Sequence, residues 1–389
     1  MRTYERTHPW LNFSLDLRTL PPHLWALLGE VASKCDHVAG VPLDPEVAKY
    51  IHHVYLAKGA LATTAIEGNT LTEDEAKAYL DGKLDLPPSR EYLGKELDNI
   101  VAAFNKIVAE ISQKGPRPLS IQQLKDMNKQ VLRGLKLEQS VVPGQLRRHP
   151  VVVGRYRCAP YEDCEFLLAK FIDFINGFSA PAGMSPIYSV LKAIIAHLYF
   201  VWIHPFGDGN GRTARLIELH ILLSSGFPQP TGHLLSNHYN LTRQEYYRKL
   251  DQARDPNGGV IAFIDYAVRG FWEGLVDQLE LIKGQQWRVA WINYVHEQFK
   301  GKNSPADTRR RVLALALSEQ EKAIGKNAIR TLTPDLAQLY AGKTTKTITR
   351  DLNRLSEMGL VKKENNRFIS QREKILAFIP WRHNSRQSK

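Results

Sequence analysis

The chain has 389 residues, of which 24% are charged, and a formal net charge of +12. This length allows two or three domains with a substantial core. No stretch is typical of a signal peptide or a membrane-spanning helix, so no membrane partner is expected. The three cysteines, Cys35, Cys158 and Cys164, have no metal-binding spacing and are odd in number, which favours a reducing cytoplasmic environment. Strand signals are few, so we expect a mainly α-helical protein.

Residues 1–45 contain several prolines and tryptophans and are predicted to form an irregular arm over a helical bundle. An apolar helix that includes Leu61 and Ala65 follows. It ends in the sequence TTAIEGN, residues 63–69, where Gly68 is suited to terminate a helix. Taken alone, this segment predicts no more than a helix end.

A short strand or one arm of a β-hairpin is predicted at Val151, Val152 and Val153, with Gly154 as the turn. An exposed strand edge has unpaired N–H and C=O groups and could accept an extended peptide. The alternative is a hairpin with a structural role only.

The most informative segment is residues 204–215, HPFGDGNGRTAR, which lies between two apolar stretches. The first, residues 190–203, predicts a buried helix that is too short to span a bilayer. The second predicts a helix that starts near Arg212. Gly209 and Gly211 let the backbone bring its N–H groups close to a ligand, and the start of the second helix favours an anion.

The polar residues of this segment suit a polyphosphate site. Asp208 supplies a hard oxygen ligand for Mg²⁺, and Asn210 could donate to a phosphate oxygen. Arg212 and Arg215 are three residues apart on one helical face and could bind phosphates bidentately. His204 follows the first helix and is a candidate general base.

This segment resembles the signature of the Fic family at every defined position. Most Fic proteins transfer AMP from ATP to a hydroxyl of a protein, so the resemblance implies a protein adenylyltransferase acting on Ser, Thr or Tyr of a target or of itself. It implies that His204 deprotonates the target hydroxyl and that Asp208 binds Mg²⁺. The Fic fold would be a helical bundle with a short β-hairpin flap, formed here by residues 151–154.

The resemblance also assigns the phosphates of ATP. Asn210, Gly211 and Arg212 would hold the α- and β-phosphates, and Arg215 would hold the γ-phosphate. Tyr246 and Tyr247 resemble the family helix that lines the adenine pocket, although at this spacing one of the two is expected in the core. The predicted ATP-binding residues are Glu67, Val151, Val152, Val153, Gly154, Asp208, Gly209, Asn210, Gly211, Arg212, Arg215, Tyr246 and Tyr247.

Beside that signature, Thr63, Glu67 and Gly68 resemble the inhibitory motif of Fic proteins. The resemblance implies that Glu67 pairs with Arg215 and occupies the space that the γ-phosphate needs. We expect a bidentate, charge-assisted pair that contributes about 1.5–3 kcal/mol. The protein would then be autoinhibited, in the class whose inhibitory helix precedes the catalytic core.

Most of the excess positive charge lies in residues 301–389, which carry 19 Lys+Arg against 8 Asp+Glu. A linker signal at residues 301–305 is followed by predicted helices at 308–317, from Pro334, and at 344–358. Two short strands, 359–363 and 367–369, flank Asn365 and Asn366. This pattern resembles a winged helix-turn-helix domain, which makes DNA a candidate partner, although many winged helices bind protein instead.

We therefore divide the chain into an N-terminal arm and inhibitory helix region (1–100), a Fic catalytic core (101–283), a connecting helix and linker (284–306) and a winged helix-turn-helix domain (307–389). Two alternatives stay open. One is a nucleotide-sensing DNA-binding transcriptional regulator. The other is a Fic protein that removes AMP or transfers another phosphate-containing group. Homodimers are common in the family, so a homodimer is a further expectation.

Overall fold

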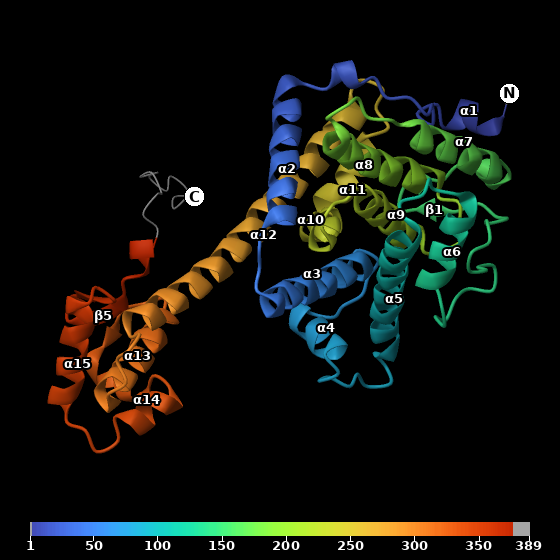
Figure 1. The fold of residues 1–389 in the computed structure, drawn as a ribbon. Helices are drawn as coiled ribbons and strands as arrows, with labels where there is room; N and C mark the ends of the chain where they lie inside the picture. Colours follow the sequence, from blue (N-terminus) through green and yellow to red (C-terminus); the bar gives the residue numbers. More distant parts are fainter. Residues whose placement is uncertain (1, 376–389) are drawn as a thin grey trace. The chain divides into compact units, whose positions relative to one another are not determined.

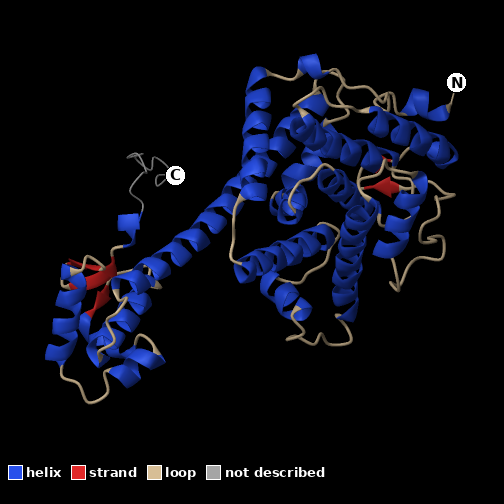
Figure 2. Cartoon of the chain, viewed as in Figure 1, coloured by secondary structure: helices blue, strands red, loops and turns tan. Residues whose placement is uncertain are grey.

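The structure is a computed structural model that describes residues 2–375, and it consists mainly of helices (Figures 1 and 2). It divides into two compact units, Met1–Glu280 and Leu281–Lys389. The end of the predicted C-terminal domain, residues 376–389, lies outside the described residues.

The first unit contains the flap, the predicted catalytic segment and the predicted inhibitory segment. Several of its helices begin at side-chain caps, because Asp44, Thr72 and Ser120 each accept a hydrogen bond from a backbone N–H of the first turn. Its elements are α1 (Thr3–Thr7), α2 (Pro22–Gly40), α3 (Pro45–Ala65), α4 (Glu73–Leu80), α5 (Glu91–Lys114), α6 (Ile121–Val131), β1 (Val152–Val153), β2 (Tyr156–Arg157), α7 (Cys164–Gly177), α8 (Ser185–Ile203), α9 (Asn210–Ser224), α10 (Leu234–Leu241), α11 (Arg243–Gln252) and the first part of α12 (Gly259–Gln298).

Helix α8 supplies much of the core of this unit. Nearly all its side chains from Ser189 to Ile203 are buried, and α2, α7 and α9 pack against it. It begins at Ser185 and has 19 residues, so by length and composition it could cross a membrane, unlike the shorter helix expected from the sequence. Its burial against the other helices of the unit is typical of a core helix.

The prediction of an irregular arm for residues 1–45 is wrong for residues 22–40, which form α2. Pro22 occupies the first helical position, where its missing N–H costs nothing. Leu24, Leu28, Val31 and Cys35 recur at helical spacing and are all buried. The prolines that suggested an irregular segment therefore mark the start of a helix.

The predicted hairpin is confirmed as a pair of two-residue strands. Val152 pairs with Arg157 and Val153 with Tyr156 in antiparallel register. Gly154 in the turn has φ +57°, a conformation that glycine adopts without strain. In the described part of the chain the sheet has only these two strands, so the outer edge of β1 is unpaired.

The second unit is built from the end of α12, three further helices and a three-stranded antiparallel sheet. Its elements are α13 (Pro305–Ser318), β3 (Ile324–Gly325), α14 (Pro334–Leu339), α15 (Thr345–Glu357), β4 (Val361–Glu364) and β5 (Arg367–Ser370), with strand order β3-β5-β4. Asn365 and Asn366 both have positive φ, as the two-residue turn between β4 and β5 requires.

Residues that the sequence assigned to a connection are part of this second core. Trp291, Val295 and Phe299, near the end of α12, are buried together with Leu313 of α13 and Leu352 of α15. The helix from residue 284 onward therefore stabilises the second unit and is more than a linker.

A buried carboxylate joins three segments of this unit. Asp351 of α15 is fully buried and accepts hydrogen bonds from Arg309 Nε (2.6 Å), Arg310 Nε (2.8 Å) and the Tyr340 hydroxyl (3.1 Å). Both its oxygens are thus paired, which offsets the cost of burying its charge.

Candidate active site

His204 lies directly after α8 and is held in a fixed orientation. Its φ of 51° is left-handed, and its backbone N–H donates to the Phe200 carbonyl. Its Nδ1 lies 3.2 Å from the Val201 carbonyl oxygen. A carbonyl can only accept, so this contact assigns the proton to Nδ1 and leaves the lone pair on Nε2. Burial lowers the pKa of His204 to about 4, although Val201 and the Glu67 carboxylate favour the charged form. The ring is therefore neutral at physiological pH.

A buried arginine supports this histidine. Arg147 is 4% exposed, and its guanidinium donates to the carbonyls of Ile203, His204 (2.7 Å), His149 (3.0 Å) and Ala159. Two of these carbonyls end α8 and two flank the flap. Its charge thus lies at the negative end of the α8 dipole, and its hydrogen bonds connect His204 to the flap.

Phe206 and Asn210 shape the loop between α8 and α9. The Asn210 amide accepts from the Phe206 N–H and donates to the Phe206 carbonyl, both at 2.9 Å. The sequence assigned this side chain to a phosphate oxygen, but here it closes the loop on itself. What Asn210 offers a ligand in this conformation is its backbone, in the first turn of α9.

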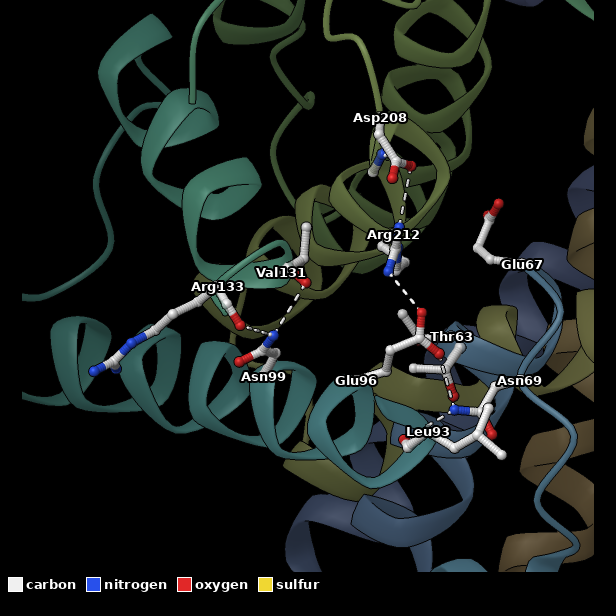
Figure 3. A network of polar contacts seen from close by, with 12 residues as sticks. Thr63, Glu67, Asn69, Leu93, Glu96, Asn99, Val131, Arg133, Asp208 and Arg212 are labelled. Carbon is white, nitrogen blue, oxygen red and sulfur yellow. Dashed lines mark hydrogen bonds and ion pairs between the residues drawn. The ribbon is translucent and has the colours of Figure 1, made fainter. Parts of the chain in front are cut away.

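Asp208 and Arg212 form the next layer of the site (Figure 3). Arg212 donates to Asp208 Oδ1 and to Glu96 Oε1 of α5, both at 3.1 Å. Both hydrogen bonds that the Asp208 carboxylate accepts from described residues, from Arg212 and from the Gly209 N–H, go to Oδ1. Oδ2 of this half-exposed carboxylate is thus available to a cation. Among the described residues no three His, Cys, Asp or Glu side chains form a metal cage, so Mg²⁺ would also need phosphate oxygens.

Arg215 contacts Glu67 as the sequence predicted, but not bidentately. One nitrogen, Nη2, donates both to Glu67 Oε1 at 2.5 Å and to the Thr63 carbonyl at 2.9 Å. Burial opposes the charge on Glu67, yet Arg215, Arg212 and His204 together hold its pKa below the ordinary value. Arg215 Nε and Nη1 are buried and have no partner among the described residues, and neither has Arg212 Nε. Unpaired buried donors are costly, so these arginines are poised to accept an anionic ligand.

Glu67 lies over the first turn of α9. A Cβ placed on Gly211 would overlap Glu67 Oε1, so only glycine at this position allows the carboxylate to approach so closely. The helix start, which favours anions, is thus occupied by an anion of the chain itself. Gly68, with φ +107°, turns the chain immediately after Glu67.

The two tyrosines of α11 differ. Tyr246 is 2% exposed, its ring stacks on Tyr239 at 4.8 Å, and its hydroxyl contacts His197 Nε2 at 2.8 Å. Tyr246 is therefore the core member of the pair. Tyr247 is 41% exposed and donates to the Ile66 carbonyl at 3.1 Å. Only the Tyr247 ring is free enough to stack on a base.

A cavity of about 460 Å³ joins the flap, His204 and Glu67. This volume is in the range of small-molecule sites. It is lined by Glu67, Val153, Gly154, Arg155, Tyr156, Val201, Trp202, His204, Gly211, Tyr246, Tyr247, Leu250, Asp251 and Arg254. The other predicted ATP-binding residues, Val151, Val152, Asp208, Gly209, Asn210, Arg212 and Arg215, do not line it.

The structure adds three residues that the sequence analysis missed. Arg147 holds His204, and Glu96 holds Arg212. Asn128 of α6 donates to the Asp208 carbonyl at 2.8 Å and accepts from the Gly144 N–H at 2.9 Å. Each is far along the chain from the residue it contacts, so no local spacing could have identified them.

Residues 118–222 match the family model described as Fic/DOC family, a range that includes residues 204–215 and the flap. The chain carries a Fic/DOC domain. This Fic domain resembles proteins named protein adenylyltransferase fic-1 from Caenorhabditis briggsae (33% identity over 207 residues) and protein adenylyltransferase Fic from Nematostella vectensis (28% over 260 residues). The matches cover 53% and 62% of this chain, but only 38% and 53% of those relatives.

Solved structures support the Fic fold. A Fic family protein from Desulfovibrio desulfuricans G20 superposes with a TM-score of 0.55 at 19% identity, covering 90% of this chain and 97% of the other. Residues 134–508 of Fic-1 from Caenorhabditis elegans superpose with a TM-score of 0.52 at 25% identity, covering 67% and 73%. The mainly helical Fic fold expected from the sequence is thus confirmed.

Proposed function

We propose that this protein is an autoinhibited protein adenylyltransferase, which transfers AMP from ATP to a Ser, Thr or Tyr hydroxyl of a target protein or of itself. The observation that carries the proposal is the pair of buried arginines, Arg212 and Arg215, with donors left unpaired beside a neutral histidine. The names of the relatives support the same activity.

In this proposal the phosphates of ATP bind at the start of α9. The unpaired Nε and Nη1 of Arg215 and Nε of Arg212 are donors for phosphate oxygens. Gly211 lets its backbone approach the ligand closely. Mg²⁺, held by Asp208 together with phosphate oxygens, would neutralise charge that develops on the leaving group.

His204 acts as the general base. The hydroxyl oxygen of the target attacks the α-phosphorus, Nε2 takes the hydroxyl proton, the bond from the α-phosphorus to the bridging oxygen breaks, and pyrophosphate leaves. The lone pair on Nε2 is available because Nδ1 contacts the Val201 carbonyl. Flap residues Val153 and Gly154 line the same cavity as His204, so a target strand paired with β1 would reach the base.

Glu67 restrains the reaction by holding Arg215. Its carboxylate lies where a γ-phosphate would contact Arg215 Nη2 and the first turn of α9. ATP would then bind in a pose that does not align its α-phosphate with the base. The native chain should therefore have low activity.

The test is self-labelling with ATP labelled at the α-phosphate. The Glu67→Gly variant should incorporate at least about tenfold more label than the native chain, on the order of one lost charge-assisted contact. Glu138→Gly, which alters an exposed loop glutamate, is the matched control and should label like the native chain. No labelling by Glu67→Gly, with or without added lysate proteins, would overturn the proposed activity.

A second function is DNA binding by the second unit, whose three helices and sheet we interpret as a winged helix-turn-helix. It is supported by a groove along α15 lined by Arg310, Lys326, Thr345, Lys346, Thr349, Arg350, Asn353, Arg354 and Glu357. Such a basic face suits a phosphate backbone. Affinity for duplex DNA should fall steeply with salt, and Lys346→Gln with Arg350→Gln should reduce that dependence. A salt-independent affinity, or binding only to an acidic peptide, would contradict it.

We also propose a cytoplasmic location. It is supported by the use of ATP and by Cys35, Cys158 and Cys164, all buried and all unpaired thiols.

A further inference from the structure

Glu67 lies in the turn that follows α3, so its placement depends on the contacts of that turn as well as on the helix. Helix α3 ends at Ala65, and the backbone N–H groups of Glu67 and Asn69 return to the Thr64 carbonyl. After Gly68, the path of the chain depends on what the side chain of residue 69 contacts. Tyr247 holds the start of the turn at the Ile66 carbonyl, and the contacts of residue 69 hold its end.

Asn69 anchors this end of the turn. It is 7% exposed, and its Nδ2 donates to the Leu93 carbonyl at 3.0 Å and to Glu96 Oε2 at 2.9 Å. Its Oδ1 accepts from the Leu71 N–H at 3.1 Å. One side chain thus fixes the turn after Glu67 and binds it to α5.

Glu96 divides its two oxygens between two partners. Oε2 holds Asn69, and Oε1 accepts from Arg212 Nη1, while the other terminal nitrogen of Arg212 holds Asp208 (Figure 3). The carboxylate is largely buried, with 16% of its side chain exposed, and burial raises its pKa. The chain Asn69–Glu96–Arg212–Asp208 therefore links the inhibitory turn to the catalytic loop without passing through Glu67 or Arg215.

We propose that Asn69 and Glu96 are positioning residues of the autoinhibition. Through Arg212, they hold the turn that bears Glu67 in a fixed place against helix α9. This inference rests on the proposed adenylyl transfer. It assigns each arginine its own carboxylate: Glu67 holds Arg215 directly, and Glu96 holds Arg212 and the anchor of Glu67 together.

Because the Glu96 carboxylate contacts both Arg212 and Asn69, binding of ATP at Arg212 would affect the turn that carries Glu67. A phosphate that draws Arg212 away from Glu96 removes one of the two contacts that hold this carboxylate in place for Asn69. By reciprocity, a turn freed from Glu96 leaves Arg212 easier to recruit. ATP with Mg²⁺ and the inhibitory turn would thus compete for the same network.

The experiment compares two buried asparagines in two backgrounds. Asn69→Ala in the native chain should raise self-labelling about threefold to tenfold, the expected consequence of losing a hydrogen bond to a charged group. In the Glu67→Gly background it should raise labelling clearly less than in the native chain, because no inhibitory carboxylate is left to position and only the freeing of Arg212 remains. Asn99 is the matched control, since this α5 residue is equally buried and binds the Val131 and Arg133 carbonyls instead. Asn99→Ala should not raise labelling in either background.

Two results would overturn the inference. One is Asn69→Ala labelling no more than the native chain, and the other is an equal increase with and without Glu67. If Glu67→Gly itself labels nothing, the proposed activity fails, and the inference is decided by melting temperatures alone. If Asn69 positions Glu67, the decreases in melting temperature caused by Asn69→Ala and by Glu67→Gly should sum to more than the decrease in the double variant. The decreases caused by Asn99→Ala and Glu67→Gly should instead be additive. Additive losses for Asn69 would overturn it.

Discussion

Each of the two units buries arginines against carboxylates, and the two clusters differ in how completely their polar atoms are paired. In the second unit Asp351 has both oxygens paired, with Arg309, Arg310 and Tyr340. The two arginines are 12% and 17% exposed at their side chains, so their remaining donors can reach water. This cluster needs nothing more, and its role is to hold α13, α14 and α15 together.

The cluster of the first unit is incomplete. Arg215 is 1% exposed at its side chain and uses one nitrogen for both Glu67 and the Thr63 carbonyl. Two of its other nitrogen donors are buried without a partner in the described part of the chain. A structural cluster would be expected to satisfy such donors, and a binding site reserves them for its ligand. The unpaired atoms, more than the presence of arginines, distinguish the site.

The largest expected effect tests whether the incomplete cluster serves a reaction. In the Glu67→Gly background, His204→Ala should reduce self-labelling at least about 100-fold, which is the lower range for loss of a general base. Affinity for ATP should change less than threefold, because the arginine donors do not touch the ring. Initial labelling rates and calorimetric titration with a non-hydrolysable ATP analogue measure the two quantities.

Labelling that persists in His204→Ala would mean that another group accepts the proton. His149→Ala is the control, because this histidine precedes the flap and its known contact uses only the backbone carbonyl. It should retain at least half the labelling rate.

The next test removes the carboxylate of the complete cluster. Asp351→Asn should lower the free energy of unfolding of the second unit by about 2–4 kcal/mol, since two arginines lose their buried counter-charge. Self-labelling by the Glu67→Gly chain should stay within twofold. Denaturant unfolding followed by tryptophan fluorescence reports the first quantity, because Trp291 is buried in that core. A stability unchanged by Asp351→Asn would show that the pairing contributes nothing.

Sequence alone identified the parts of the site that are continuous in the chain. Residues 204–215 contain the proposed base, the proposed metal ligand and the glycines of the proposed phosphate site in one stretch, and their types and order point to the proposed chemistry. Glu67 was found at a distance because a second short motif, with Gly68 after it, pointed to it. The first arm of the hairpin, predicted at residues 151–154, followed from a valine run and a glycine.

What sequence could not identify depends on contacts between distant segments. Arg147 reads as one of two adjacent arginines, and only the fold shows that it is buried while Arg148 is exposed. Asn210 fits the signature, yet its amide bonds its own loop. Tertiary packing also decides between Tyr246 and Tyr247, which have nearly the same local sequence. A helix or short motif depends on residues that are close in sequence. The hydrogen bonds of a buried donor depend on residues from distant parts of the chain.

That adjacent pair of arginines gives a smaller and sharper test. Arg147→Gln should lower the labelling rate of the Glu67→Gly chain about tenfold, because the carbonyls of Ile203 and His204 lose the cation that fixes the base. Affinity for ATP should change less than threefold. Arg148→Gln should change neither quantity. Equal losses of rate and ATP affinity in Arg147→Gln would indicate a general folding defect instead of a role in positioning.

The smallest expected effect is a change in stability with pH, which reports the protonation of His204. Burial puts the pKa of His204 at about 4 in the folded chain, below its unfolded value near 6.5. Between these values the unfolded chain binds more protons, so stability is full above pH 6.5 and is lost as the pH falls towards 4. By pH 5.5 this loss should be about 1 kcal/mol for the first unit.

His204→Asn should lack that portion of the loss, since asparagine does not titrate, while losses due to other buried histidines stay in both chains. Urea unfolding of both chains at pH 7.5 and 5.5 measures the difference. Equal losses of stability in the two chains would place the His204 pKa near its ordinary value. The ring beside the incomplete arginine cluster would then be partly protonated at physiological pH.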